Sequence, residues 1–481
     1  MALRQKVKSG LIWTFADKIV SQVVFLVFGI VLARLVSPSA FGLVGMVTIF
    51  SNFALLFLDL GFGAALVQKK DISDVHLSSV FWMNMGIGFS LYGLFFAAAP
   101  LLADFYGQPE LTLLIRVICL TFILSSASSV QSNMLVKDLK FRKKVVISWV
   151  SMAVGYGLAF YLAFHGFGPW ALVAMTLSTA AISTVMCWFA TPWFPSFVFE
   201  WDKIKELSRF GLNFLGDTSV NYWSRNYDNF IVAKVLGSTD LGIYSRAYSL
   251  MLLPLRNITT IFARVMFPAF AQRQGDLALL RKYYLEIILH IALITFPLMV
   301  ALAMVSREFV LVFFGPVWVR MVPVLSILAG LGAVQSVVSL NGLIYNSLGK
   351  AHIAFRVSVF SNLVLIAAMT AGVQFGIVGV SWSYLIASLV LFFPIYGTAI
   401  RQLELKIWDV VRFLKGIIIA TLLMAAALFL LNLFTDLPPL LGLVVKGSGA
   451  AIVYGSAVLF LERKLVAETR TRIMKLIPKR K

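Results

Sequence analysis

Residues 33–44 read ARLVSPSAFGLV, and residues 233–244 read AKVLGSTDLGIY. Placed over one another, the two stretches keep Ala33 over Ala233 and Gly42 over Gly242, and most other positions are similar. Each copy has a short polar break, SPSA or GSTD, between two apolar runs. Self-similarity at a fixed offset is typical of membrane proteins built from two repeats. Chance similarity between apolar segments is the alternative explanation.

The apolar runs around these breaks determine the class of protein. The chain has 481 residues, of which 60% are hydrophobic and 13% charged, and its mean hydropathy is +0.91. A helix needs about 20 mostly apolar residues to cross the hydrocarbon of a bilayer. The sequence therefore predicts an all-α polytopic membrane protein with about fourteen transmembrane helices. The expected spans are 10–34, 41–66, 76–101, 110–135, 145–165, 168–190, 209–236, 241–270, 283–305, 320–347, 353–373, 377–400, 413–433 and 441–461.

The distribution of basic residues predicts the orientation of the chain. Lys and Arg number 41 against 21 Asp and Glu, a net charge of +20. In a soluble chain this charge would indicate a nucleic-acid partner, but here most basic residues lie in every second break between apolar runs. The opposite breaks carry Arg307, with Arg320 at a helix edge. The positive-inside rule then places both termini in the cytoplasm. We expect no nucleic-acid partner.

The repeat also predicts how the helices are grouped. Two further pairs of stretches are similar: MLVKDLKFRKKV with SLGKAHIAFRVS, and GFGPWALVAMTLS with FGIVGVSWSYLIAS. We expect a six-helix bundle in residues 1–200, a second one in 201–405, and two additional helices with a basic cytoplasmic tail in 406–481. No loop is long enough for a soluble catalytic domain. No GxxxxGK[ST] phosphate loop is present, so nucleotide hydrolysis would need a separate subunit.

Ionisable residues inside spans are expensive and are functional candidates by default. On the seventh predicted helix, four polar residues fall within about 80° of one another at 100° per residue; they are Asp217, Asn221, Arg225 and Asp228. On the eighth, six occupy an arc of about 100° that rises roughly 27 Å; they are Arg246, Ser249, Arg256, Asn257, Thr260 and Arg264. The first helix has a narrower stripe of Thr14, Asp17 and Ser21 beside Lys18.

Arginine suits a diphosphate because its rigid fork makes paired hydrogen bonds and keeps its charge in a partly dry cavity. We therefore expect an anionic ligand near Arg225, Arg246, Arg256 and Arg264, with Asn221 and Asn257 as neighbours. Asp17, Lys18, Asp217 and Asp228 are candidates for coupling or gating. The alternative is that these charges are structural pairs, Arg225 with Asp228 one turn away being the simplest.

Metal and redox chemistry find no support in the sequence. The four histidines, at positions 76, 165, 290 and 352, have no ligand spacing. The two cysteines, Cys119 and Cys187, lie inside apolar runs and form no CxxC pair. We expect no metal, no cofactor and no catalytic residue, so the chain is not predicted to be an enzyme.

Several stretches resemble the Wzx-type polysaccharide flippases of the colanic acid and teichuronic acid exporter group, within the multidrug/oligosaccharidyl-lipid/polysaccharide exporter superfamily. The resemblance covers nearly the whole chain and is most specific in residues 225–275. The stretches are RNYDNFIVAKVLGSTDLGIYSRAYSLMLLPL, RVMFPAFAQRQGD, FFGPVWVRMVPVLSIL, ARLVSPSAFGLVGMV and MLVKDLKFRK.

The resemblance implies a multi-pass protein of the bacterial cytoplasmic (inner) membrane. It implies outward movement of an undecaprenyl-diphosphate-linked oligosaccharide by gradient-driven alternating access, with membrane lipids, a polysaccharide polymerase and a chain-length regulator as partners. It carries cavity roles onto Arg225, Arg246, Arg256 and Arg264 and onto Asp228. A drug or cation antiporter of the same superfamily is one alternative, although cationic drugs favour acidic cavities. A membrane-embedded glycan polymerase or ligase is another, but it would need a sizeable outward loop.

Overall fold

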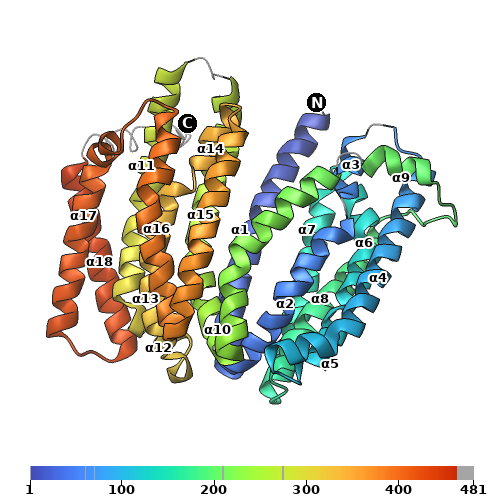
Figure 1. The fold of residues 1–481 in the computed structure, drawn as a ribbon, viewed down its shortest axis with the longest axis horizontal. Helices are drawn as coiled ribbons and strands as arrows, with labels where there is room; N and C mark the ends of the chain where they lie inside the picture. Colours follow the sequence, from blue (N-terminus) through green and yellow to red (C-terminus); the bar gives the residue numbers. More distant parts are fainter. Residues whose placement is uncertain (1, 60, 70, 209–210, 273–275, 463–481) are drawn as a thin grey trace, which may run out of the picture. The chain divides into compact units, whose positions relative to one another are not determined.

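A computed structural model describes residues 2–59, 61–69, 71–208, 211–272 and 276–462. Within these ranges every regular element is a helix (Figure 1). The chain divides into two compact units, Met1–Gly242 and Ile243–Lys481. The predicted division into 1–200, 201–405 and 406–481 stays a prediction.

The first unit is built from nine helices and the first arm of a tenth. Its helices pack mainly in the pairs α7 on α8, α4 on α6, α1 on α7 and α6 on α8. Their bounds are α1 (Ala2–Leu35), α2 (Pro38–Asp59), α3 (Phe62–Gln68), α4 (Asp74–Tyr106), α5 (Leu111–Ile118), α6 (Leu120–Lys137), α7 (Phe141–Phe164), α8 (Pro169–Ala190), α9 (Trp201–Ser208) and α10 (Gly211–Gln272), which continues into the second unit.

The second unit holds the rest of α10 and all later helices. Its main packed pairs are α11 on α13, α15 on α16, α17 on α18, and α11 on α17. The bounds are α11 (Leu277–Met304), α12 (Ser306–Phe313), the 3₁₀ turn η1 (Pro316–Trp318), α13 (Met321–Val338), α14 (Asn341–Ser347), α15 (Ala351–Gly372), the 3₁₀ turn η2 (Val373–Phe375), α16 (Gly376–Arg401), α17 (Ile407–Phe434) and α18 (Pro439–Leu461).

Eleven helical segments of the described chain are long and apolar enough to cross a membrane. One of them, His352–Arg401, contains both α15 and α16. Neither arm of α10 is among these eleven described segments. The predicted all-α polytopic fold is confirmed, whereas the number of fourteen spans and the cytoplasmic termini stay predictions.

The predicted break between spans 209–236 and 241–270 is present. Inside α10, Gly237 has φ +85° and ψ −173°, far from helical values. A positive φ carries a steric penalty for residues with a Cβ but none for glycine, so the helix is interrupted here at little cost. The break divides α10 into two arms and places GSTD at the bend.

The two repeated stretches of the sequence meet at two glycines. A Cβ added at Gly42 would overlap the carbonyl oxygen of Ser238, and one added at Gly242 would overlap that of Pro38. Under the repeat, Pro38 corresponds to Ser238, so each of these contacts is the equivalent of the other. Exchanged contacts of this kind are the mark of a two-fold relation. The geometry therefore supports the internal repeat.

The turns that precede α7 and α15 have the same geometry and lie within the second pair of similar stretches, although letter-by-letter pairing sets Lys137, not Lys140, over Lys350. Leu139 (φ +57°) precedes α7 and Gly349 (φ +69°) precedes α15. In both turns the N–H of the following lysine bonds to a carbonyl five residues earlier: Lys140 to Leu135 at 2.8 Å and Lys350 to Tyr345 at 2.8 Å. The same turn thus begins a helix in each half of the sequence.

We predict that Gly42→Ala and Gly242→Ala each lower the free energy of unfolding by about 3 kcal/mol, because a methyl group must push backbone against backbone. The measurement is the thermal unfolding midpoint of the purified protein in detergent. Gly93→Ala is the matched control, since a Cβ on that α4 glycine would meet nothing within 4 Å. An unchanged midpoint in both crossing variants would refute the close approach.

A buried ion pair fastens α18 to α12. Lys446 Nζ lies 2.5 Å from Glu308 Oε1, and the two side chains are only 6% and 12% exposed. Two further polar contacts hold the C-terminal helix pair: Asn432 donates to the Met304 carbonyl at 3.2 Å, and Tyr454 donates to the Leu293 carbonyl at 2.8 Å. Lipid gives helices little hydrophobic reason to associate, so polar contacts and close packing must hold the pair.

Lys446→Met should lower the free energy of unfolding by about 3 kcal/mol, because it leaves a buried carboxylate without its partner. The double variant Lys446→Met with Glu308→Leu should recover most of this loss, since it removes both charges. Thermal midpoints of the two variants against the unmodified protein provide the measurement. A double variant as unstable as the single one would show that the pair does more than neutralise charge.

Candidate functional site

The first arm of α10 presents a polar face at mid-helix. Arg225 and Asn221 are exposed, and Arg225 Nε donates to Asn221 Oδ1 at 3.1 Å. Asp228, one turn later, is only 3% exposed, and its Oδ1 accepts from the backbone N–H of Asn229 at 2.8 Å. This contact of the arginine is to an amide oxygen and uses one N–H group, so its remaining N–H groups can reach other acceptors.

Aromatic packing on α2 orients this arm. Trp223 and Phe230 make edge contacts with Phe50, with ring centroids 6.0 and 6.1 Å apart. The Tyr222 hydroxyl donates to the Ile49 carbonyl at 2.5 Å. At 100° per residue, Arg225 is about 160° from Trp223 around the helix. Because the tryptophan side packs on α2, the arginine side faces away from it.

The predicted stripe on α1 is polar but locally satisfied. Ser21 Oγ donates to Asp17 Oδ1 at 3.3 Å, and Thr14 donates to the Gly10 carbonyl at 2.8 Å. Asp17 and Lys18 are both half-buried. These contacts allow a coupling role for Asp17 and Lys18 but do not assign one.

The second unit contributes Arg246 and Asn257 from the other arm of α10. Arg246 is half-buried, and Asn257 Nδ2 donates to the Leu253 carbonyl of its own helix at 2.9 Å. Tyr248 stacks on Tyr384, with centroids 6.5 Å apart, and the Tyr384 hydroxyl accepts from Gln335 at 3.1 Å. Tyr248, which follows Arg246 by two residues, thus contacts a ring whose hydroxyl is hydrogen-bonded to an amide.

Three predicted residues cannot be placed. The side chains of Asp217, Arg256 and Arg264 lie outside the described residues, so their roles stay predictions. Arg225 belongs to the first unit and Arg246 to the second. A single cavity that both arginines line likewise stays a prediction.

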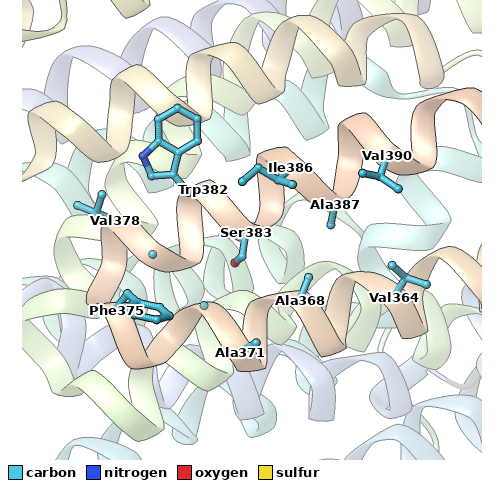
Figure 2. Close-up of a pocket in the computed structure, with 12 residues that line it drawn as sticks. Val364, Ala368, Ala371, Phe375, Val378, Trp382, Ser383, Ile386, Ala387 and Val390 are labelled. Atoms are coloured by element: carbon cyan, nitrogen blue, oxygen red, sulfur yellow. The ribbon is translucent and has the colours of Figure 1, made fainter.

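A groove between α15 and α16 is lined almost entirely by apolar groups. Its volume is about 630 Å³, and Figure 2 shows Trp382 and Phe375 near one end and Val364 and Val390 near the other. The side-chain polar atoms of its lining are the Ser383 hydroxyl and the Trp382 indole nitrogen. A sugar or diphosphate would find few hydrogen-bonding partners and no charged group here, so this groove is a poor fit for a headgroup.

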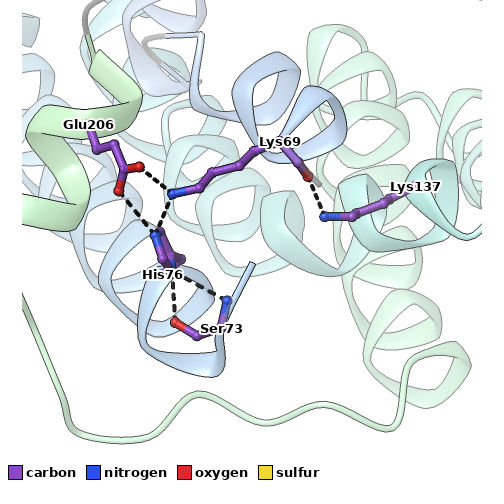
Figure 3. Close-up of polar contacts among 5 residues, drawn as sticks. All are labelled: Lys69, Ser73, His76, Lys137 and Glu206. Carbon is purple, nitrogen blue, oxygen red and sulfur yellow. Dashed lines mark hydrogen bonds and ion pairs between the residues drawn. The ribbon is translucent and has the colours of Figure 1, made fainter. Parts of the chain in front are cut away.

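A polar cluster that the sequence did not predict fixes α9 to α4. Glu206 of α9 accepts from Lys69 Nζ at 2.6 Å and lies 3.4 Å from His76 Nε2 (Figure 3). Ser73 caps α4, and its Oγ lies 2.7 Å from His76 Nδ1. The hydrogen bond from Lys69, with that from His76, lowers the pKa of the Glu206 carboxyl.

The same helix is also held by apolar contacts. Ile204 and Leu207 are buried against Phe62, Leu77 and Phe81. Since α9 directly precedes α10, the attachment fixes where α10 begins. The missed signal was SDVH at residues 73–76, a capping box in which His76 takes the place of the usual glutamate.

Because the pKa of Glu206 is lowered in the fold, the attachment should persist at neutral pH and be lost as the pH falls below the usual glutamate value of about 4.3. At neutral pH, Glu206→Gln should raise amide hydrogen exchange in α9 by a factor of up to about five, as expected for an exposed ion pair. Asp202→Asn is the control, because among the described residues the ion pair of Asp202 lies along its own helix, with Lys205 at 4.0 Å. Equal exchange in both variants would contradict the attachment.

No group of three or more His, Cys, Asp or Glu side chains suited to a metal ion occurs in the described part of the chain. Cys119 and Cys187 are both buried and free.

These features define a multi-pass helical membrane protein with charged side chains in the middle of a long helix. Residues 31–323 match the family described as "Polysaccharide biosynthesis protein". The chain is 30% identical over 400 residues to the teichuronic acid biosynthesis protein TuaB of Bacillus subtilis (strain 168), covering 81% of this chain and 82% of TuaB. It is 28% identical to the succinoglycan biosynthesis transport protein ExoT of Rhizobium meliloti (strain 1021), covering 91% and 89%.

Among solved structures, the lipid II flippase MurJ in an inward closed conformation has a TM-score of 0.74 at 14% identity, covering 95% of this chain and all (100%) of that one. That likeness shows a shared fold. The chain belongs to the polysaccharide biosynthesis protein family, and the resemblance derived from its sequence is confirmed.

Proposed function

We propose that this protein is a flippase that moves a diphosphate-linked oligosaccharide on an undecaprenyl carrier from the cytoplasmic to the outer leaflet of the bacterial inner membrane. Its family supports a role in polysaccharide biosynthesis. The relative ExoT is a transport protein, and MurJ, which has the same fold, is a lipid II flippase. The protein acts as a transporter and not as an enzyme, and it delivers its product to a polymerase and a chain-length regulator.

The observation that carries this proposal is the exposed Arg225 at the middle of the first arm of α10. Its Cα lies about 18 Å along the helix from Gly237. An arginine exposed to hydrocarbon at such depth is costly, so its guanidinium belongs in a water-filled space. With Asn221 as its hydrogen-bonded neighbour, it offers paired N–H donors to a phosphate.

The remaining arginines extend this site in the proposal. Arg246, Arg256 and Arg264 follow the second arm of α10, where they would contact the diphosphate at successive depths as the substrate crosses. Asn257 would bind sugar hydroxyls. The acidic residues Asp17, Asp217 and Asp228 would compensate the cationic site when it is empty, with Lys18 beside the first of them.

Transport needs no nucleotide in this mechanism. In a cell that is negative inside, moving an anionic headgroup outward is downhill by about 2.3 kcal/mol per charge per 100 mV. The return of the empty site is then the step that needs compensation. Arginine does not release its proton in proteins, so protonation of a nearby carboxylate can tune that step.

The experiment uses purified protein in liposomes with a fluorescent isoprenyl-diphosphate sugar, an imposed potential and no ATP. We expect potential-dependent flipping, and Arg225→Ala should slow it about thirtyfold through the loss of charge-assisted hydrogen bonds. Arg225→Lys should retain part of the rate, because a point charge replaces the fork.

Arg356→Ala is the control, since this exposed arginine lies at the start of α15 and outside the proposed site. Normal insertion of all variants is checked by size-exclusion profile. Flipping that requires ATP would contradict the mechanism. An Arg225→Ala rate equal to that of Arg356→Ala would remove Arg225 from the site.

A further inference from the structure

The junction between α16 and α17 forms a second groove, and its chemistry differs from that in Figure 2. Its volume is about 560 Å³. Phe392, Phe393, Gly397 and Ile400 line it from α16, and Ile407, Trp408 and Val411 line it from α17. Arg401 and Lys406 lie at the basic end. The groove thus joins an apolar wall to two cationic side chains.

The groove exists because α17 packs on its other neighbours. Its main partners are α11 and α18, whereas it meets α16 only sparsely. Gly397 has no side chain to fill the groove. A Cβ added there would lie 3.6 Å from Ile407 Cδ1, on the opposite wall. Two large side chains at the rim are open to their surroundings: Trp408 is 76% exposed and Phe393 is 64% exposed.

The acidic residues of the junction are engaged elsewhere. Glu404 is paired with Arg281 of α11, with Oε2 2.7 Å from Nη2. Asp409 Oδ2 accepts from the backbone N–H of Lys406 at 2.8 Å. Lys350 donates to Gln402 at 2.7 Å and, with Arg281, holds the loop in place. The loop is therefore fixed by contacts that leave the positive charge of Arg401 directed at the groove's end.

We propose that this groove binds an anionic glycerophospholipid, with the phosphate at Arg401 and Lys406 and an acyl chain against Phe392, Gly397 and Val411. An exposed tryptophan at a helix end is typical of the membrane interface. Basic pockets between helices on the cytoplasmic side are suited to anionic headgroups. A resident phospholipid fits better than the transported lipid, because the groove opens on the helix surface and contains none of the α1 or α10 residues assigned to transport.

The test measures lipid binding and does not depend on transport. Protein in nanodiscs receives phosphatidylglycerol with a photoactivatable acyl chain, and labelled peptides are identified by mass spectrometry. Labelling should concentrate in residues 392–411. Arg401→Gln with Lys406→Gln should weaken binding about thirtyfold, as expected for two basic residues near an anionic headgroup. All variants change exposed or groove-lining positions, and native mass spectra confirm that they are folded.

Gly397→Leu provides an independent arm, because it fills the groove while both charges remain. It should reduce labelling to the level of the charge variant. Arg412→Gln with Lys415→Gln is the matched control: it removes the same charge from exposed positions of α17 outside the groove, and binding should stay within about twofold of the unmodified protein, the scatter of a few tenths of a kcal/mol expected for surface changes.

Three results would overturn the proposal. Equal loss in the Arg412 and Lys415 control would show general surface attraction. Full labelling of Gly397→Leu would show that no chain occupies the groove. Displacement of phosphatidylglycerol by inorganic phosphate, or by isoprenyl diphosphate at lower concentration, would assign the cationic end to a free anion or to the transported lipid.

Discussion

In hydrocarbon, every backbone N–H and C=O must find a partner within the protein, and this constraint governs the rest of the structure. It makes each apolar run a helix. The helices are interrupted at residues whose backbone conformation is not helical. Gly237 interrupts α10, and Leu139 and Gly349 adopt left-handed conformations before α7 and α15. It also makes an unpaired polar side chain expensive, so Lys446 is buried only together with Glu308.

Close approach of backbones is the second requirement of such a bundle, because lipid offers no hydrophobic gain when two helices meet. The reciprocal contacts of Gly42 with Ser238 and of Gly242 with Pro38 satisfy it at the repeated stretches. The same residues carry the internal repeat in the sequence, so packing accounts for why both copies keep a glycine there.

The helices could be predicted from the sequence because hydropathy and helical period are local properties, and the bend at Gly237 follows from the same reasoning. Contacts between residues that are distant in sequence could not be predicted in this way. Lys446 stands within the expected span 441–461, but its partner Glu308 lies 138 residues away. The contact of His76 with Glu206 could not be predicted from local spacing, because Glu206 is 130 residues away on a short helix. For Arg225, the period predicted its face and its nearness to Asn221, but not the aromatic packing on α2 that turns this face away.

The central claim is that this chain brings a lipid-linked oligosaccharide to the outer leaflet. The most direct measurement is the leaflet position of that lipid in intact spheroplasts, probed with a membrane-impermeant oxidant of sugars while expression of the chain is switched on or off. Our account predicts that the sugar is protected in cells depleted of the chain and becomes accessible within minutes of its return. Equal accessibility in depleted and replete cells would contradict it.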